Sequence, residues 1–111
     1  MALGGISALT LESMRVREKI LSDFLIRTPT IPLNSSFFKK IVSKGQLFCK
    51  LECHQHTNTF KARGALSVVL GIPMEKRQFG ITAASAGNHA IASAWAAFKL
   101  GMSAKVVMQS T

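Results

Sequence analysis

Apolar residues recur at helical spacing over residues 9–26, which predicts an amphipathic helix near the start of the chain. Thr10 and Ser13 have the residue types and the spacing that cap such a helix. The segment 27–32 contains two prolines, and a residue before proline avoids helical backbone angles, so we expect an extended segment there. The predicted apolar stripe consists of Leu9, Leu11, Met14, Val16, Ile20, Leu21, Phe24 and Leu25.

After the prolines, helix and strand signals alternate along the chain. An alternating run over 46–53 predicts a strand, and an almost wholly apolar run over 80–85 is typical of a central strand in a parallel sheet. The other expected elements are a short helix over 37–42 capped by Ser35 or Ser36, helices over 60–70 and 88–100, and a strand over 104–108.

From residue 46 the predicted order of elements is β-α-β-α-β. Strands joined by helices pair in parallel through right-handed crossovers, so the sequence predicts an α/β fold preceded by the N-terminal helix. A buried parallel strand needs a helix to cover it, and none follows the strand over 104–108. We therefore expect these residues to form an incomplete domain.

Composition and charge narrow the class of protein. The chain has 111 residues and is 48% hydrophobic, which excludes a disordered chain, and its longest uncharged apolar stretch is too short to span a membrane. Two cysteines and no recognisable export signal favour a reducing cytoplasm. The net charge of +9 raises the question of a nucleic-acid partner, but the basic residues are scattered and not interleaved with aromatic residues. Such charges are typical of solvated helix faces, so no nucleic acid is expected.

Lys61 is the first candidate for chemistry. It stands in Thr59-Phe60-Lys61-Ala62-Arg63-Gly64, where a predicted helix begins beside small apolar residues. Partial burial would favour the neutral amine, which can attack a carbonyl carbon and form a Schiff base with pyridoxal phosphate. The alternative is an ordinary lysine whose ammonium group reaches solvent, and one lysine alone favours that alternative.

The segment Ser85-Ala86-Gly87-Asn88-His89 is the second candidate, because it joins a predicted strand to a predicted helix. Ligands of open α/β sheets bind at the carboxyl ends of strands. The unpaired N–H groups and the dipole of a helix start favour a carboxylate or phosphate, and small residues let the backbone approach it. The alternative is a plain helix start that Ser85 or Asn88 caps.

Together, and in this order, the two segments resemble a known family. Thr59–Ala65 resembles the lysine signature of fold-type II pyridoxal-phosphate enzymes, in particular the threonine/serine dehydratase and serine racemase family. Ser85–Ala90 resembles the loop of that family that holds the substrate carboxylate. Arg27-Thr28-Pro29 and Lys50-Leu51-Glu52 fit the same pattern, so the resemblance covers about residues 9–108 and the amino-terminal part of a family member.

The resemblance implies a three-layer α/β enzyme with pyridoxal 5'-phosphate as its cofactor. Lys61 would hold the cofactor as a Schiff base and would then act as the base on the substrate Cα. Phe60 would pack beside the cofactor ring, and Asn88 would hydrogen-bond the 3-hydroxyl group of the ring. The substrate carboxylate would be held by Ser85, the backbone N–H groups of Ala86 and Gly87, Asn88 and His89.

The implied reaction removes water from threonine or serine and gives a 2-keto acid and ammonia. Position 86 is Ala, where the racemases of the family resemble one another in having a serine as the opposite-face base, so dehydration is favoured. A serine racemase-like or other β-eliminating enzyme is the alternative within the family. A truncated, non-catalytic fragment that docks its uncovered sheet onto a partner is the alternative from another class.

The resemblance also implies how the chain is divided. Residues 1–45 would belong to the larger domain of the enzyme, and residues 46–111 would form the first part of its small α/β domain. The full-length enzyme would be a homo-oligomer. Its glycine-rich loop for the cofactor phosphate would lie beyond residue 111, so the 111-residue chain alone should be inactive. Asn58-Thr59 stands where the family usually has Gly-Ser, and asparagine tolerates unusual backbone angles.

A zinc site is the competing interpretation of the polar residues before Lys61. Two thiols and two imidazoles, from Cys49, Cys53, His54 and His56, are ligand types that zinc accepts. Cys49 and Cys53 would lie about 13 Å apart along a straight strand, which is too far to share one ion. Core cysteines and loop histidines are therefore favoured, and no metal is expected.

Overall fold

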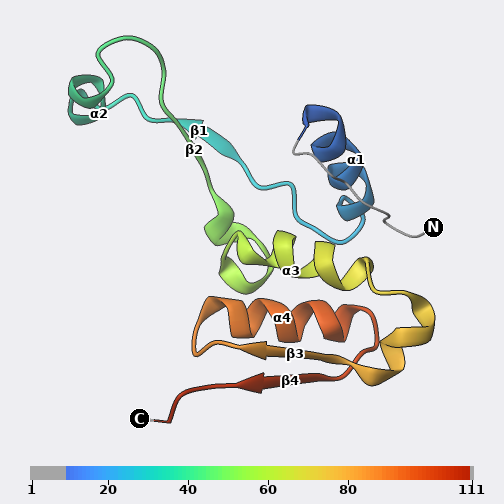
Figure 1. The fold of residues 1–111 in the computed structure, drawn as a ribbon. Coiled ribbons are helices and arrows are strands. Elements are labelled where there is room, and N and C mark those ends of the chain that lie inside the picture. Colours follow the sequence, from blue (N-terminus) through green and yellow to red (C-terminus); the bar gives the residue numbers. More distant parts are fainter. Residues whose placement is uncertain (1–9, 111) are drawn as a thin grey trace.

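Helices and strands alternate along residues 10–110, the part of the chain that this computed structural model describes, which confirms the α/β class (Figure 1). The elements are α1 (Leu11–Leu21), β1 (Thr30–Pro32), α2 (Ser36–Ile41), β2 (Phe48–Lys50), α3 (Lys61–Leu70), β3 (Ile81–Ala84), α4 (Asn88–Lys99) and β4 (Ala104–Val107). Short 3-10 helices, η1 (Glu52–His54), η2 (His56–Asn58) and η3 (Met74–Phe79), connect them.

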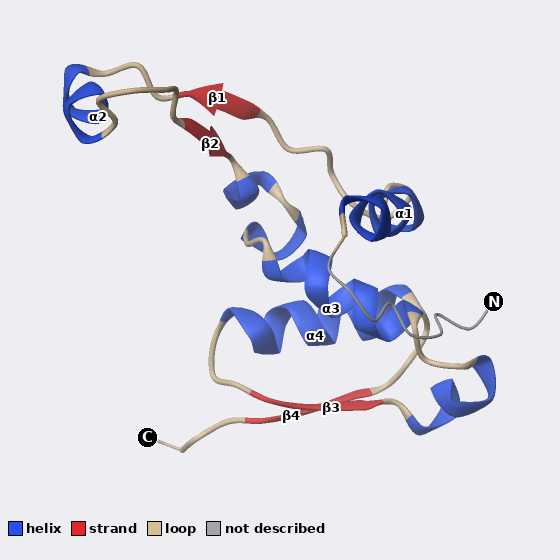
Figure 2. Ribbon diagram, turned by 45° about the horizontal axis from the view of Figure 1, so that its top comes forward, coloured by secondary structure: helices blue, strands red, loops and turns tan. Residues whose placement is uncertain are grey.

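The candidate site is carried by two helices and a two-stranded sheet. β3 and β4 pair in parallel, from Ile81 opposite Ala104 to Ala84 opposite Val107, and α4 connects them. α3 packs on α4, and both helices lie on the same side of the sheet (Figure 2). The third layer of the predicted three-layer fold is therefore not among the described residues.

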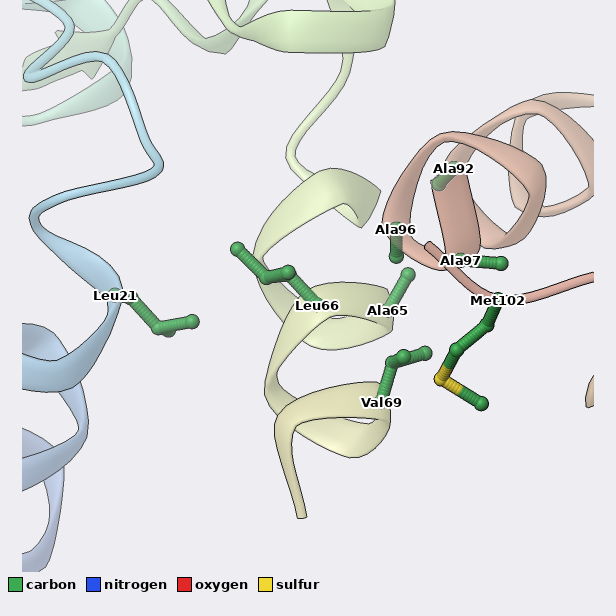
Figure 3. Close-up of a cluster of buried hydrophobic side chains, with 8 residues drawn as sticks. All are labelled: Leu21, Ala65, Leu66, Val69, Ala92, Ala96, Ala97 and Met102. Atoms are coloured by element: carbon green, nitrogen blue, oxygen red, sulfur yellow. The ribbon is translucent and has the colours of Figure 1, made fainter. Parts of the chain in front are cut away.

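Small side chains let α3 and α4 approach closely. Ala92 and Ala96 are four residues apart on one face of α4, and both are fully buried against α3. On the other side of α3, Leu66 points toward Leu21 of α1, so that one helix joins the two halves of the core (Figure 3). The buried cluster consists of Leu21, Ala65, Leu66, Val69, Ala92, Ala96, Ala97 and Met102.

α1 begins with the predicted cap and ends earlier than predicted. The N–H of Ser13 donates to Thr10 Oγ1, and the N–H of Thr10 donates to Ser13 Oγ, each at 3.1 Å. The helix stops at Leu21 instead of residue 26, and Leu21 is the buried residue of α1, because the helix meets the core only at its carboxyl end. Leu9 and the predicted helix start lie outside the described residues.

The predicted strand over 46–53 is the main correction to the expected fold. Only β2 forms there, and it pairs antiparallel with β1, with Ile31 opposite Cys49. The expectation that this strand joins the parallel sheet is wrong, so residues 10–110 contain one parallel β-α-β unit. The connection through α2, which Ser35 caps as expected, folds back on itself and brings β2 beside β1 (Figure 1). Antiparallel neighbours of this kind need no crossover helix.

The helices α3 and α4 agree more closely with the sequence prediction. The buried positions of α3 are Ala62, Ala65, Leu66 and Val69, and they recur at helical spacing. Gly101 follows the C-cap of α4 with a φ of 65°, the left-handed conformation in which glycine commonly ends a helix. Within residues 10–110, no helix combines the length and the apolar character that a membrane span requires.

Candidate active site

Lys61 is the first residue of α3 and follows a sharp turn of the chain. Thr57 and Asn58 both have positive φ, at 66° and 53°, and Thr59 then leads toward the helix in an extended conformation. The N–H of Lys61 donates to Thr59 Oγ1 at 3.3 Å. The turn therefore places the half-buried Lys61 at the amino end of a helix.

The turn before Lys61 is strained at Thr57. A β-branched residue is a genuine outlier in the left-handed region, and Thr57 Oγ1 is buried without a hydrogen-bond partner among the described residues. Asn58 is of a residue type that tolerates such angles, as the sequence indicated. Backbone strain persists only where the surrounding structure holds it in place, and it is concentrated at functional sites.

The second predicted segment leaves the carboxyl end of β3. The N–H of Ser85 donates to Val107 O at 3.0 Å, and Ser85 Oγ accepts from the N–H of Gly87 at 3.2 Å. Gly87 is the N-cap of α4, and no side chain caps it. The alternative in which Ser85 or Asn88 caps the helix is therefore wrong, and the start of α4 retains N–H donors for an anion.

A hollow of about 380 Å³ brings the two segments together. Phe60, which is 64% exposed, and Asn88 both line it, together with Asn58 and Thr59. The other wall is formed by residues 49–53, which include the end of β2. An exposed aromatic side chain beside an amide suits such a hollow to a flat polar ring.

The remaining predicted residues lie around this hollow. Lys61 directly follows Phe60, and Ser85–Gly87 directly precede Asn88, but none of these side chains lines it. His89 instead lines a second hollow of about 340 Å³, which α3, β3 and α4 enclose. The roles predicted for Lys61, for the loop and for His89 stay predictions.

Sequence reasoning missed the ion pair of the site, although Glu52 is one of only five acidic residues in the chain. Arg63 Nε donates to Glu52 Oε2, and Arg63 Nη2 donates to Glu52 Oε1, each at 2.7 Å. Thr28 Oγ1 also donates to Glu52 Oε1, and Lys50 Nζ donates to Thr28 O at 2.6 Å. The hydrogen bonds from Arg63 lower the pKa of Glu52 from 4.5 to about 2, and Glu52 in turn raises the pKa of Arg63.

Gln55 is the second residue that sequence reasoning missed. It is 2% exposed, and its side-chain amide pairs with the backbone of Ile26: Oε1 accepts from the N–H at 3.1 Å, and Nε2 donates to the carbonyl at 2.8 Å. Oε1 also accepts from the N–H of His56 at 3.0 Å. No sequence signal marks this role, because Gln55 lies in a polar stretch without periodicity.

Because the pKa of Glu52 is low in the folded chain, we expect the free energy of unfolding to depend on pH. Its pKa is about 2 in the folded chain and near 4.5 when unfolded, so its contribution is present above pH 4.5 and is lost as the pH falls toward 2. We expect a loss of about 2 kcal/mol in the free energy of unfolding, less than the full shift implies, since solvent screens the pair. Urea denaturation of Glu52→Gln should show a flatter pH profile in this window, and exposed Glu75→Gln should keep the wild-type profile. Identical profiles for all three proteins would contradict the ion pair.

His56 and the cysteines have other contacts in the structure. In residues 10–110, no group of three or more His, Cys, Asp and Glu side chains could hold a metal ion. His56 stacks on Trp95, with ring centroids 5.1 Å apart, and so connects η2 to α4. Cys49 and Cys53 are free thiols that line the hollow beside Phe60. The expectation of core cysteines is wrong, because Cys49 is only partly buried and Cys53 is exposed.

The class of protein follows from the residues that line the hollow and from their neighbours along the chain. Phe60 and Asn88 line it, and the Lys61 amine and the Ser85–Gly87 loop directly adjoin these two residues in the sequence. An amine at one helix start and an anion-receptive loop at the other suit an α/β enzyme that uses an aldehyde cofactor on an anionic substrate. The family described as "Pyridoxal-phosphate dependent enzyme" matches residues 21–111, and the chain belongs to this family. The predicted cofactor is thereby confirmed at the level of the family.

Known proteins resemble the chain over most of its length. The catabolic L-threonine dehydratase of Staphylococcus aureus is 42% identical over 91 residues, which cover 82% of this chain and 26% of the dehydratase. Maize serine racemase aligns with a TM-score of 0.75 and 34% identity, over 88% of this chain and 30% of the racemase. The processed form of threonine deaminase isoform 2 from Solanum lycopersicum aligns with a TM-score of 0.69 and 30% identity, over 100% of this chain and 30% of the deaminase. The chain thus spans about a quarter to a third of the length of these proteins.

Proposed function

We propose that the complete protein containing this chain is a pyridoxal-phosphate-dependent dehydratase of threonine or serine. It would remove water from the hydroxy amino acid and release a 2-keto acid and ammonia. The observation that carries the proposal is the hollow where Phe60 and Asn88 meet, beside Lys61 and the Ser85–Gly87 loop. The similar proteins named threonine dehydratase and threonine deaminase support this reaction.

The residues at the hollow fit the cofactor ring. Phe60 offers an exposed aromatic face for the ring, and the Asn88 amide can donate a hydrogen bond to the ring hydroxyl. The amine of Lys61, one residue from Phe60, would attach the cofactor at its aldehyde carbon. When bound, the cofactor supplies an electron-accepting ring that stabilises negative charge at the substrate Cα.

The chain's own groups would handle the substrate and the proton. Ser85 and the N–H groups of Ala86 and Gly87 would hold the substrate carboxylate, which requires the Gly87 N–H to exchange its contact with Ser85 Oγ for the substrate. This grip orients the Cα–H bond. His89 would have to turn away from the second hollow to join them. Lys61 Nζ would take the Cα proton and pass it to the β-hydroxyl group, which would leave as water. The released enamine would then take up one water molecule and give the 2-keto acid and ammonia.

Ala86 distinguishes the proposed dehydratase from a racemase. Racemisation needs a second acid or base on the opposite face of Cα, and the methyl side chain of Ala86 can neither donate nor accept a proton. With L-serine and cofactor, the complete protein should release keto acid and leave the remaining serine in the L form. A keto-acid assay and chiral chromatography measure these two quantities. Rapid formation of D-serine without keto acid would overturn the proposal.

Ala86→Ser is the matched variant for this experiment. The added hydroxyl group supplies a proton carrier at the start of the loop without changing the residues that line the hollow. We expect it to raise the rate of D-serine formation by roughly a hundredfold, since a positioned acid or base contributes at least that much. An unchanged rate would show that the position 86 side chain does not face the substrate.

A non-catalytic role of the 111-residue chain is the second candidate. It is favoured by apolar side chains that α4 and β4 leave exposed, among them Phe98 at 78% and Val107 at 62%. Titration with pyridoxal 5'-phosphate separates the two candidates, because tight uptake that depends on Lys61 would contradict a non-catalytic role. The proposal includes no nucleic-acid partner, and steeply salt-dependent retention on DNA would contradict that part of it.

Three parts of the proposal concern the complete protein. Residues 1–45 would belong to its larger domain and residues 46–111 to its small domain, with the β1–β2 pairing between them. A homo-oligomer is expected, and light scattering would measure its mass. The free thiols of Cys49 and Cys53 favour a reducing compartment such as the cytoplasm.

A further inference from the structure

The Glu52–Arg63 ion pair encloses the strained turn that precedes Lys61. Glu52 begins η1, and Arg63 lies in the first turn of α3, two residues after Lys61. Their contacts at 2.7 Å close the segment 52–63 into a loop. Thr57 and Asn58, the residues of this turn that have positive φ, lie inside the loop.

Two more contacts attach the loop to the segment that follows α1. The side-chain amide of Gln55, inside the loop, pairs with the backbone of Ile26. The backbone carbonyl of Gln55 accepts from the N–H of Asn58 at 2.8 Å. Thr28 donates to Glu52 at the start of the loop. These contacts supply the surrounding structure that a strained turn requires.

The start of α3 has one side-chain contact of its own, from the N–H of Lys61 to Thr59 Oγ1, and no negative charge to complement the helix dipole. Phe60, the N-cap residue, makes no side-chain cap, and the first turn contains no acidic residue. That turn instead carries two basic residues, Lys61 and Arg63, at the helix end where positive charge is unfavourable. Glu52 supplies the missing negative charge, and the planar guanidinium of Arg63 fixes the direction of the contact.

We propose that Glu52 and Arg63 are positioning residues for the Lys61 amine. Their ion pair holds the strained turn, which sets the orientation of the first turn of α3 and therefore the direction from which the amine reaches a cofactor. This inference rests on the proposed function of Lys61. Without the pair, the amine would sample several directions and would attach the cofactor more slowly, since a small misplacement of a reacting group costs a large factor in rate.

The rate of cofactor attachment at Lys61 tests the inference. The complete protein is mixed with pyridoxal 5'-phosphate and quenched with borohydride at set times, and mass spectrometry measures the label on each lysine. We expect Glu52→Gln to lower the rate at Lys61 by about tenfold and to leave exposed Lys76 unchanged. Arg63→Lys, which keeps the charge and loses the two-point contact, should also lower the rate at Lys61.

Val69→Ala is the matched control for a loss of stability alone. Val69 is a buried residue of α3 outside the loop, so its truncation destabilises the core without removing a contact of Glu52. At a temperature where circular dichroism shows every variant folded, Val69→Ala should keep the wild-type rate at Lys61. A wild-type rate in Glu52→Gln and Arg63→Lys, or an equal loss in Val69→Ala, would overturn the positioning role alone. Absence of label at Lys61 in the wild-type protein would overturn the proposed function as well.

Discussion

Replacing Lys61 with alanine should abolish the attachment of pyridoxal 5'-phosphate to the complete protein. Lys61 is the amine at the start of α3, directly after the aromatic residue that lines the hollow. Other amines would react only as solvent-exposed groups, without the advantage of proximity. We therefore expect the borohydride-fixed product to fall by roughly a hundredfold or more, as measured by absorbance and by mass spectrometry of the intact protein.

Lys50→Ala is the sharpest control for this prediction, because Lys50 also lines the hollow. Its Nζ donates to Thr28 O at 2.6 Å, and this contact directs the amine toward the segment after α1. The Lys50 variant should therefore keep its attachment of the cofactor. A product that survives in Lys61→Ala and disappears in Lys50→Ala would assign the chemistry to the other lysine.

Gly80→Ala should be among the most destabilising single substitutions in the unit formed by α3, β3, α4 and β4. Gly80 has a φ of 70°, which alanine rarely adopts, and an added Cβ would lie 2.6 Å from the backbone oxygen of Ser103. Ser103 directly precedes β4, and its carbonyl accepts from the N–H of Ile81 at 2.9 Å, so relief of the clash would separate β3 from β4. We expect a loss of about 3 kcal/mol in the free energy of unfolding.

Gly64→Ala is the matched control, because Gly64 lies inside α3 and an added Cβ would meet nothing within 4 Å. Alanine in a helix interior should stabilise the chain by about 0.5–1 kcal/mol. Urea denaturation of the complete protein, followed by circular dichroism and by tryptophan fluorescence, measures both variants. Equal midpoints for the two would contradict the close approach of Gly80 to Ser103.

The sequence predicted the helices α3 and α4 better than the pairing of the strand over 46–53. Caps, glycine stops and the spacing of buried residues are local, and they placed α3 and α4 within a residue or two of their observed ends. The alternation over 46–53 indicates an extended segment, but the same alternation fits a parallel or an antiparallel neighbour. The partner, β1, was decided by the way the chain folds back through α2.

The candidate site was predictable to a similar degree. Lys61 and Asn88 stand in segments whose residue types indicate their chemistry, so both could be named from the sequence. The Glu52–Arg63 contact could not be inferred in this way, because it depends on the turn between them and on Thr28, which comes from the other side of the β1–β2 pairing. Gln55 gave no signal, since only its burial makes its amide important.

By itself, the sequence determined the family, the cofactor chemistry and the approximate ends of the elements that carry it, because these depend on residue types and local spacing. Only the tertiary structure decided that Phe60 and Asn88 share a hollow while His89 lines another. It also decided that Glu52 encloses the turn before Lys61. Contacts of this kind join segments that are distant along the chain, so they depend on how the whole chain packs and leave no trace in local preferences.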